Sequence, residues 1–198
     1  MRIIGGSAAG LILKAPAGYD VRPTPDLVRQ AIFNSLGERV VGTRVLELFG
    51  GTGALSLECL SRGAAHAFCI EHSAKHARFI AQNLAATRLP AESFQVRVQD
   101  VFVAIQQLAV AQRRFDLILA DPPFGKKNVG QRSESFSQRL LDHAAVPQLL
   151  APNGLFVLGH TKRDTLSLPT GWREIKVLKH GDSRVRFLQA NDERQTDP

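Results

Sequence analysis

Gly42-Thr-Arg-Val-Leu-Glu-Leu-Phe-Gly-Gly-Thr-Gly53 is the stretch that decides the fold of this chain. Its apolar residues follow a turn signal at Gly42 and predict a short buried strand at 45–49. Three glycines within four positions then predict a sharp turn in which a ligand can approach bare backbone. After Gly53 the apolar residues take helical spacing and predict a helix over 53–62. A strand, a glycine turn and a helix in this order are typical of the nucleotide-binding half of a doubly wound sheet.

The same alternation continues along the chain. Apolar runs predict strands at 67–71, 94–98 and 115–120, and helical spacing predicts helices at 73–86, 101–111 and 134–150. Carboxylates stand at the ends of these strands, namely Glu71, Asp100 and Asp121. Because ligands of open α/β sheets bind at the carboxyl ends of the strands, we expect these side chains to share one site.

The C-terminal part is expected to close the sheet. Apolar runs at 154–158, 173–178 and 185–188 predict three more strands, with no helix between the last two. Such a pair predicts a final hairpin inserted antiparallel. The expected fold class is therefore α/β, a Rossmann-like, doubly wound and mostly parallel sheet with an antiparallel C-terminal strand.

Residues 1–37 are expected to form a small annex in front of a core at 38–190. Two short runs, Arg2–Ile4 and Leu11–Lys14, flank a glycine-containing turn and predict a hairpin. Thr24 is the expected N-cap of a following helix, with Pro25 at its first position. The polar residues 191–198 are expected to be a disordered tail.

Length and composition favour one domain, and the excess of positive charge favours a polyanionic partner. The 198 residues are 44% hydrophobic, but the apolar runs are too short to span a bilayer, and the N-terminus lacks a secretory signal. Cys59 and Cys69 lie in apolar segments and are expected to be buried thiols. A cytoplasmic location and a monomer are therefore expected. The net charge of +7 favours nucleic acid as a partner.

Basic residues gather beside the predicted site. The candidates for contacts to phosphates are Arg2, Arg22, Arg29, Lys126 and Lys127. Their placement next to the glycine turn and to Asp121 favours a polyanionic substrate over generic solubility. His72 and His76 are four residues apart, but no third ligand is evident, so no metal site is expected.

The glycine turn differs from a dinucleotide fingerprint. It reads Gly51-Thr-Gly53-Ala-Leu-Ser56, so the third glycine of G-x-G-x-x-G is absent, and Glu47 stands within the preceding strand. A carboxylate beside the turn suits a cationic ligand better than a pyrophosphate, and a sulfonium ligand that carries an ammonium group meets this requirement. Glu71 is then expected to accept from ribose hydroxyls, and Asp100 from an adenine amino group.

Taken together, these motifs resemble the class I S-adenosylmethionine-dependent methyltransferases. Asp121-Pro-Pro-Phe124 is similar to the signature of enzymes that methylate planar amino nitrogens. With Arg2-Ile-Ile-Gly-Gly6, Arg22-Pro-Thr24, Val28-Arg29, Phe33-Asn34 and Lys179-x-Gly181-Asp-Ser183, the chain resembles the RsmD family over roughly residues 2–188. The resemblance implies methylation of a guanine 2-amino group in small-subunit ribosomal RNA, free or in the subunit. It also implies a cofactor site built from Glu47, Phe49, Gly51, Gly53, Glu71 and Asp100.

Two positions depart from the family pattern. Glu47 stands where many relatives carry Asp. Val157-Leu-Gly-His160 stands where an acidic residue is expected after the fifth strand, so the resemblance assigns no role to this region.

The expected catalytic residues are Asp121, Pro122 and Phe124. A guanine amino lone pair is delocalised into the ring and is a poor nucleophile. Two acceptors on its N–H groups, the Asp121 carboxylate and the Pro122 carbonyl, would favour a pyramidal nitrogen, while Phe124 offers a face for an extruded base. The transfer itself requires alignment more than acid–base help.

Three alternative functions remain open at this point. The first is an amino-methyltransferase that acts on adenine in DNA or RNA, or on a protein glutamine, although such enzymes more often carry Asn where this chain has Asp121. The second is a non-enzymatic RNA-binding protein, which the intact motifs disfavour. The third is a nicotinamide dehydrogenase, which Ser56 disfavours.

Overall fold

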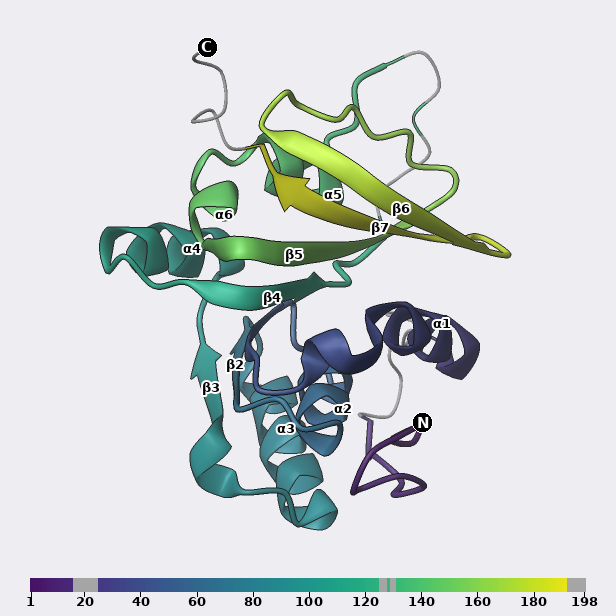
Figure 1. Cartoon of the computed structure of the whole chain (residues 1–198), viewed down its shortest axis with the longest axis vertical. Coiled ribbons are helices and arrows are strands. Elements are labelled where there is room, and N and C mark those ends of the chain that lie inside the picture. Colours follow the sequence, from purple (N-terminus) through teal and green to yellow (C-terminus); the bar gives the residue numbers. More distant parts are fainter. Residues whose placement is uncertain (16–24, 125–127, 129–130, 192–198) are drawn as a thin grey trace.

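The computed structural model describes residues 1–15, 25–124, 128 and 131–191. Within these residues seven strands form one sheet in the order β3-β2-β1-β4-β5-β7-β6 (Figure 1). The strands are β1 (Arg44–Leu48), β2 (His66–Glu71), β3 (Phe94–Val98), β4 (Phe115–Ala120), β5 (Leu150–Thr161), β6 (Trp172–His180) and β7 (Ser183–Ala190). Neighbours from β3 to β5 are parallel, whereas β7 is antiparallel to both β5 and β6. The predicted doubly wound sheet with an antiparallel closing hairpin is confirmed.

The helices also follow the predicted alternation, with one correction. They are α1 (Asp26–Leu36), α2 (Ala54–Ser61), α3 (Ala74–Thr87), α4 (Val101–Val110), α5 (Phe136–Asp142) and α6 (Ala145–Gln148), with 3₁₀ turns η1 (Gly37–Val40) and η2 (Ala91–Ser93). The single helix expected at 134–150 was wrong, because α5 and α6 are separated at His143. Pro147 has no N–H to donate to the His143 carbonyl and would clash with it in a continuous helix.

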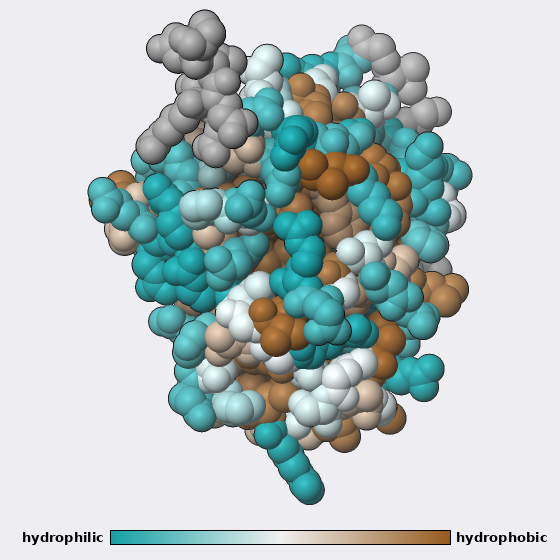
Figure 2. Space-filling model, viewed as in Figure 1, coloured by the Kyte–Doolittle hydropathy of each residue, from teal (hydrophilic) through white to brown (hydrophobic). Residues whose placement is uncertain are grey.

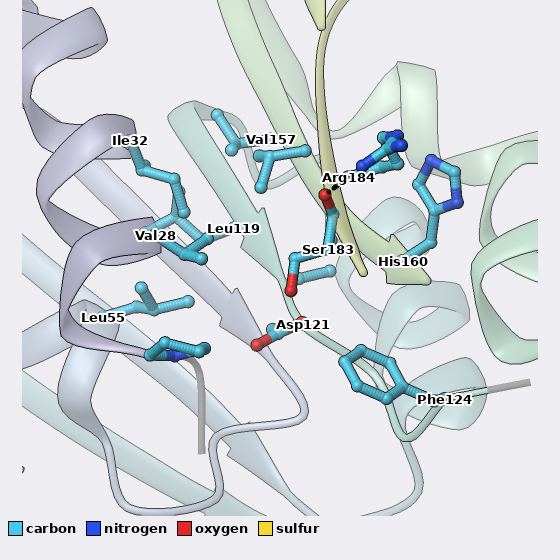
Figure 3. A pocket seen from close by; sticks show the side chains of 14 residues that line it. Val28, Ile32, Leu55, Leu119, Asp121, Phe124, Val157, His160, Ser183 and Arg184 are labelled. Carbon is cyan, nitrogen blue, oxygen red and sulfur yellow. Dashed lines mark hydrogen bonds between the residues drawn. The ribbon is translucent and has the colours of Figure 1, made fainter. Parts of the chain in front are cut away.

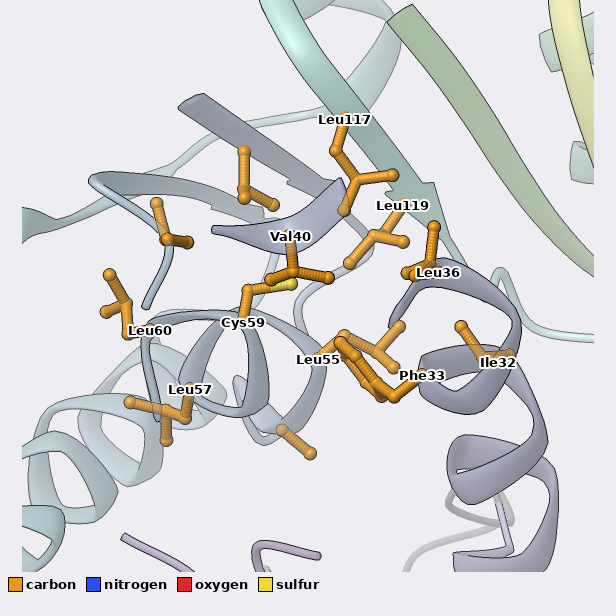
Figure 4. Close-up of a cluster of buried hydrophobic side chains, with 14 of the residues drawn as sticks. Ile32, Phe33, Leu36, Val40, Leu55, Leu57, Cys59, Leu60, Leu117 and Leu119 are labelled. Carbon is orange, nitrogen blue, oxygen red and sulfur yellow. The ribbon is translucent and has the colours of Figure 1, made fainter. Parts of the chain in front are cut away.

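Strand residues alternate between two hydrophobic cores. In β4, Leu117 and Leu119 face the core with α1, α2 and α3, while Ile118 and Ala120 face the core with α4, α5 and α6. Figure 4 shows the first core, where Phe33 and Ile32 of α1 meet Leu55 of α2 beneath the sheet. Both faces are therefore covered, as a parallel sheet requires.

The N-terminal segment is fastened to the core through buried polar side chains. The expected hairpin is reduced to one antiparallel bridge between Arg2 and Ile12. The carboxylate of Glu58 in α2, which is fully buried, accepts from the N–H groups of Ile4 (2.7 Å) and Gly5 (2.8 Å). Because backbone groups of the segment are satisfied by helix side chains, it does not need a sheet of its own.

The helix α1 begins one residue later than expected. Pro25 has an extended ψ of 145° and precedes the first helical residue, Asp26. The predicted N-cap Thr24 lies outside the described residues, as does the expected tail beyond Asn191.

The surface mixes hydrophobic and hydrophilic residues. On the face shown in Figure 2, hydrophobic residues form small patches among hydrophilic ones. None of the helices in the described ranges combines the length and hydropathy needed to cross a bilayer.

Candidate active site

The glycine turn after β1 has a backbone that few residues other than glycine adopt. Gly51 and Gly53 have φ values of +57° and +75°, and Phe49 also has a positive φ of +62°. A Cβ on Gly53 would lie 2.9 Å from Ile80 of α3, so the turn packs closely against that helix. A Cβ on Gly51 would meet no atom closer than 3.9 Å. The turn is therefore closed on its inner side and open at Gly51, where a ligand can approach.

Glu71 holds this turn from the neighbouring strand. Its Oε2 accepts from the Gly51 N–H at 2.7 Å, and its Oε1 accepts from the Ser73 N–H at 2.8 Å. The residue is 7% exposed at the carboxyl end of β2. Its Oε1 also lies 3.3 Å from the Nδ1 of His76, whereas its Oε2 has a further lone pair that a hydroxyl donor can use.

Glu47 supports the turn from below. It is 2% exposed, and its Oε2 accepts from the Ser56 N–H of α2 at 3.0 Å. Burial raises the pKa of Glu47 to about 7, against the opposing effect of hydrogen bonds from Ser56, Cys69 and Leu55. The expectation that this carboxylate meets a cationic ligand is therefore revised, because the structure directs it to the start of α2.

Asp100 lies beside the glycine turn region at the end of the next strand, β3, and is the second predicted cofactor-binding carboxylate. It follows β3 and caps α4, where its Oδ1 accepts from the N–H groups of Phe102 (2.9 Å) and Val103 (3.1 Å). The residue is exposed, and its Oδ2 takes no part in these two bonds. Both predicted carboxylates, Glu71 and Asp100, therefore lie at the carboxyl ends of adjacent strands.

An aromatic cluster that the sequence did not reveal lies beside Asp100. Phe49 packs against Phe102 and Phe136, with ring centroids 6.5 Å and 5.4 Å apart. The guanidinium of Arg139 lies 4.0 Å from the Phe102 ring centroid. These residues come from α4, α5 and the glycine turn, and only the tertiary structure brings them together.

Asp121 lies at the end of β4 in a hollow that is lined mainly by apolar residues. The hollow is lined by Val28 and Ile32 of α1, Leu55 of α2, Leu119–Asp121 and Phe124, Val157, Gly159 and His160 of β5 and Ser183–Val185 of β7, with Pro25 at its rim. Figure 3 shows Asp121 and Ser183 in the middle of this hollow, between the apolar side chains of α1 and the ring of Phe124. The enclosed volume of the hollow is about 20 Å³.

Gly159 provides the space for the Asp121 side chain. A Cβ at position 159 would lie 2.4 Å from the Asp121 Oδ1 and 3.2 Å from its Cγ. In the sequence, residues 157–160 stand out only as a departure from the family pattern. The structure shows that Gly159 of β5 is the neighbour against which Asp121 rests.

His160 borders the same hollow and is held in one tautomer. Its Nδ1 lies 3.0 Å from the Thr161 carbonyl oxygen, while its Nε2 accepts from the Nε of Arg186 at 3.2 Å. Burial and the nearby Arg186 lower the pKa of His160. The ring is therefore neutral and donates from Nδ1.

The structure describes only some of the remaining residues predicted to bind the base or the RNA backbone. Phe124 is 52% exposed, so one face of its ring is accessible, whereas Pro122 is buried. Lys126, Lys127 and Arg22 lie outside the described residues.

The prediction that Arg29 contacts phosphates was wrong. Its side chain is fully buried, and its Nη2 donates to the Arg2 carbonyl at 2.6 Å and to Asp26 Oδ1 at 2.7 Å. Arg29 therefore anchors the N-terminal segment to α1. The side chain of Arg2 is 67% exposed, and its ion pair within the described residues is a long contact with Asp26, 3.8 Å, so it stays a candidate for phosphate contact.

Comparisons with known proteins show which sequences and folds this chain is similar to. A family model described as conserved hypothetical protein 95 matches residues 1–189. Ribosomal RNA small subunit methyltransferase D of Escherichia coli (strain K12) is 38% identical over 204 residues, covering 100% of this chain and 93% of that protein. A solved structure described as methyltransferase yhhF from Escherichia coli has a TM-score of 0.73 at 28% identity, covering 96% of this chain and 97% of that one. A further structure, methyltransferase SMU.776 complexed with SAH, has a TM-score of 0.66 at 16% identity over 84% of this chain and 50% of that one, which supports the fold.

Proposed function

The chain belongs to the family described as conserved hypothetical protein 95, the RsmD family of methyltransferases, and on this premise we propose that it transfers a methyl group from S-adenosylmethionine to the 2-amino group of a guanine in small-subunit ribosomal RNA. A relative named for methylation of small-subunit ribosomal RNA aligns with the whole chain at 38% identity. The net charge of +7 suits a polyanionic substrate.

The glycine turn and the strand ends fit the cofactor. Gly51 is open on its outer side, and Glu71 and Asp100 keep acceptor capacity beside it. We assign Glu71 to the ribose hydroxyls, Asp100 to the adenine amino group, and Phe49, Gly51 and Gly53 to the cofactor's surroundings. Glu47 acts one step further away, since it orients the start of α2. When bound, S-adenosylmethionine supplies an electrophilic methyl group.

The observation that carries the proposal is the position of Asp121. Its carboxylate lies in the hollow at the carboxyl end of β4, the strand next to β1 and its glycine turn. There it can accept a hydrogen bond from an exocyclic N–H, with the Pro122 carbonyl as the second acceptor. Two such bonds localise the nitrogen lone pair and align it for the transfer, which is the main requirement of this reaction. Phe124 offers its exposed ring face for stacking with the extruded base.

The neutral His160 and the Asp121 carboxylate have different roles. His160 faces Arg186 and backbone carbonyls, and so it stabilises the wall formed by β5 and β7. Asp121 is the carboxylate that lines the hollow.

Methyl transfer to defined substrates tests this proposal. The protein is incubated with labelled S-adenosylmethionine and either small-subunit ribosomal RNA or subunits that lack the modification, and the product nucleoside is identified by mass spectrometry. We expect N2-methylguanine at one position. Asp121→Ala should lower turnover at least about a hundredfold, roughly 2.7 kcal/mol, with unchanged affinity for S-adenosylhomocysteine by calorimetry. Methylated adenine, methylated glutamine in protein, or an Asp121→Ala variant with full turnover would each refute the assignment.

A further inference from the structure

The loop after β5 and the tip of the β6–β7 hairpin carry a group of cations that the fold itself does not use. We call the side chains of Lys162, Arg163, Lys179 and Arg184 the tip cluster. Lys162 forms an ion pair with Asp182, and Lys179 and Arg184 are directly opposite in the β6–β7 hairpin. The cluster and Asp182, the acidic residue of the turn, together carry a net charge of +3 (four cations minus one anion). In Figure 1 the tip of this hairpin extends beyond the ends of the neighbouring strands.

Strand register places like charges opposite one another in this cluster. Lys179 of β6 pairs with Arg184 of β7, and Arg184 pairs in turn with the neutral His160 of β5. Directly opposite residues share one face of the sheet, so the two cationic side chains lie side by side. Like charges in such positions destabilise a sheet. A local cost without a structural gain is typical of a functional surface.

The anionic partners that the fold supplies are too few for this cluster. Asp182 forms an ion pair with Lys162 at 2.7 Å, and its pKa is lowered first by Lys162 and then by Arg163 and Arg184. Among the described residues, the guanidinium of Arg184 donates to two carbonyls, those of Gly181 (3.1 Å) and Ser183 (2.8 Å). In the described part of the chain, the exposed side chains of Arg163 and Lys179 have no hydrogen-bond or ion-pair partner.

Other cations of the same hairpin differ in this respect. Arg186 is paired with Glu174, Arg173 donates to Gln189, and Lys176 donates to Ser35 of α1. In the described part of the hairpin, the cations without a side-chain partner therefore lie at the tip. The tip adjoins the hollow, because Ser183 and Arg184 line it together with Asp121.

We propose that the tip cluster is a docking surface for RNA, and that Arg163, Lys179 and Arg184 contact the backbone phosphates of nucleotides flanking the base that enters the Asp121 hollow. This inference rests on the proposed function and adds the element that holds the substrate. Phosphate contacts fix the register of a nucleic acid without reading its sequence. The hairpin therefore orients the RNA, while the hollow selects the base.

The test compares two double variants of the full-length protein. Arg163→Gln with Lys179→Gln removes two cations from the tip cluster, and Arg113→Gln with Arg114→Gln removes two exposed cations at the amino edge of β4, away from the hollow. RNA affinity is measured against salt concentration. We expect the slope of log affinity against log salt to become shallower by about 1.4–1.8 in the tip variant and to stay unchanged in the edge variant. At saturating RNA the tip variant should keep the wild-type kcat, with KM for RNA raised at least tenfold.

The outcomes separate this inference from the proposed function. An unchanged slope and KM in a tip variant that binds S-adenosylhomocysteine normally would overturn the inference, even when the wild type methylates guanine. Equal losses in the tip and edge variants would overturn it as well, because they indicate a general charge effect. If the wild type does not methylate ribosomal RNA, the proposed function fails, and the salt slopes still decide whether the tip binds RNA.

Discussion

Gly159 is the residue on which the position of Asp121 depends. Its backbone has no positive φ, so an alanine there creates no backbone strain, and the contact at 2.4 Å involves the end of a flexible side chain. We expect Gly159→Ala to leave the free energy of unfolding nearly unchanged, because the Asp121 carboxylate can rotate away. The same rotation should lower turnover at least about tenfold, or 1.4 kcal/mol. Steady-state kinetics and urea unfolding measure the two effects.

Gly171→Ala is the matched control for this substitution. A Cβ at Gly171 meets no atom within 4 Å, and this glycine also lacks a positive φ. Its turnover should equal that of the wild type. Equal turnover in both variants would show that Asp121 tolerates displacement and that the geometry of the hollow is not critical.

Glu47 makes the stability of the protein depend on pH. Its pKa in the folded state is raised to about 7, above the ordinary value of 4.5, so the folded state binds more protons than the unfolded state between these values. The contribution of Glu47 to stability is therefore fully present below about pH 4.5 and is lost as the pH rises to about 7, at up to about 1.4 kcal/mol per pH unit.

Glu47→Gln removes this titration while keeping an acceptor for the Ser56 N–H. The free energy of unfolding of the variant minus that of the wild type should increase by a few kcal/mol as the pH is raised from 5 to 8. Urea unfolding at both pH values measures the difference. If the free energies of unfolding of the two proteins change in parallel with pH, the raised pKa of Glu47 is contradicted.

At the scale of elements, α2 holds both the cofactor turn and the N-terminal segment. In its first turn, the Ser56 N–H donates to the Glu47 carboxylate. Near its C-terminal end, the Glu58 carboxylate accepts from the N–H groups of Ile4 and Gly5 and forms an ion pair with Arg62. The helix thus links the annex to the cofactor site. Asn83 of α3 adds a second link, because its Nδ2 donates to the carbonyls of Lys14 and Thr52.

Glu58→Ala should release the N-terminal segment. The substitution leaves two partly buried N–H groups without their acceptor and removes the charged partner of Arg62, so a loss of about 3 kcal/mol is expected in urea unfolding. Glu58→Gln keeps one acceptor oxygen and should lose less. Faster hydrogen exchange at Ile4 and Gly5 in the alanine variant would locate the effect, and protection equal to that of the wild type would contradict it.

At the scale of the whole molecule, cofactor binding should stabilise the fold. The proposed site joins the glycine turn, β2 and the start of α4, so a bound ligand favours the folded over the unfolded state. At a concentration of S-adenosylhomocysteine one hundred times its Kd, the gain is about 2.7 kcal/mol. For a chain of this size the melting temperature should rise by roughly 5–10 °C. Calorimetry or thermal fluorescence measures the shift, and NADH at equal concentration serves as the control. A shift with NADH alone would exclude the cofactor assignment.

The sequence by itself determined the order of strands and helices, the glycine turn and the carboxylates at the strand ends. These are local features, because hydrophobic periodicity, glycine positions and proline constraints depend on residues close in the chain. For the same reason the Asp121-Pro-Pro-Phe124 motif is recognisable from consecutive residues alone. One local signal was overlooked, since Pro147 already excluded a continuous helix over 134–150.

Only the tertiary structure decided which side chains are accessible and which strands are neighbours. Arg29 is a candidate for phosphate contact by residue type, yet its guanidinium is buried against the Arg2 carbonyl and Asp26, 27 and 3 residues away in the chain. Gly159 meets Asp121 because β5 pairs with β4. The tip cluster exists because β7 inserts between β5 and β6 and brings Arg184 into register with Lys179. The contacts of Arg29 with Arg2 and of Gly159 with Asp121 join segments distant in the chain, which no local pattern of residues specifies.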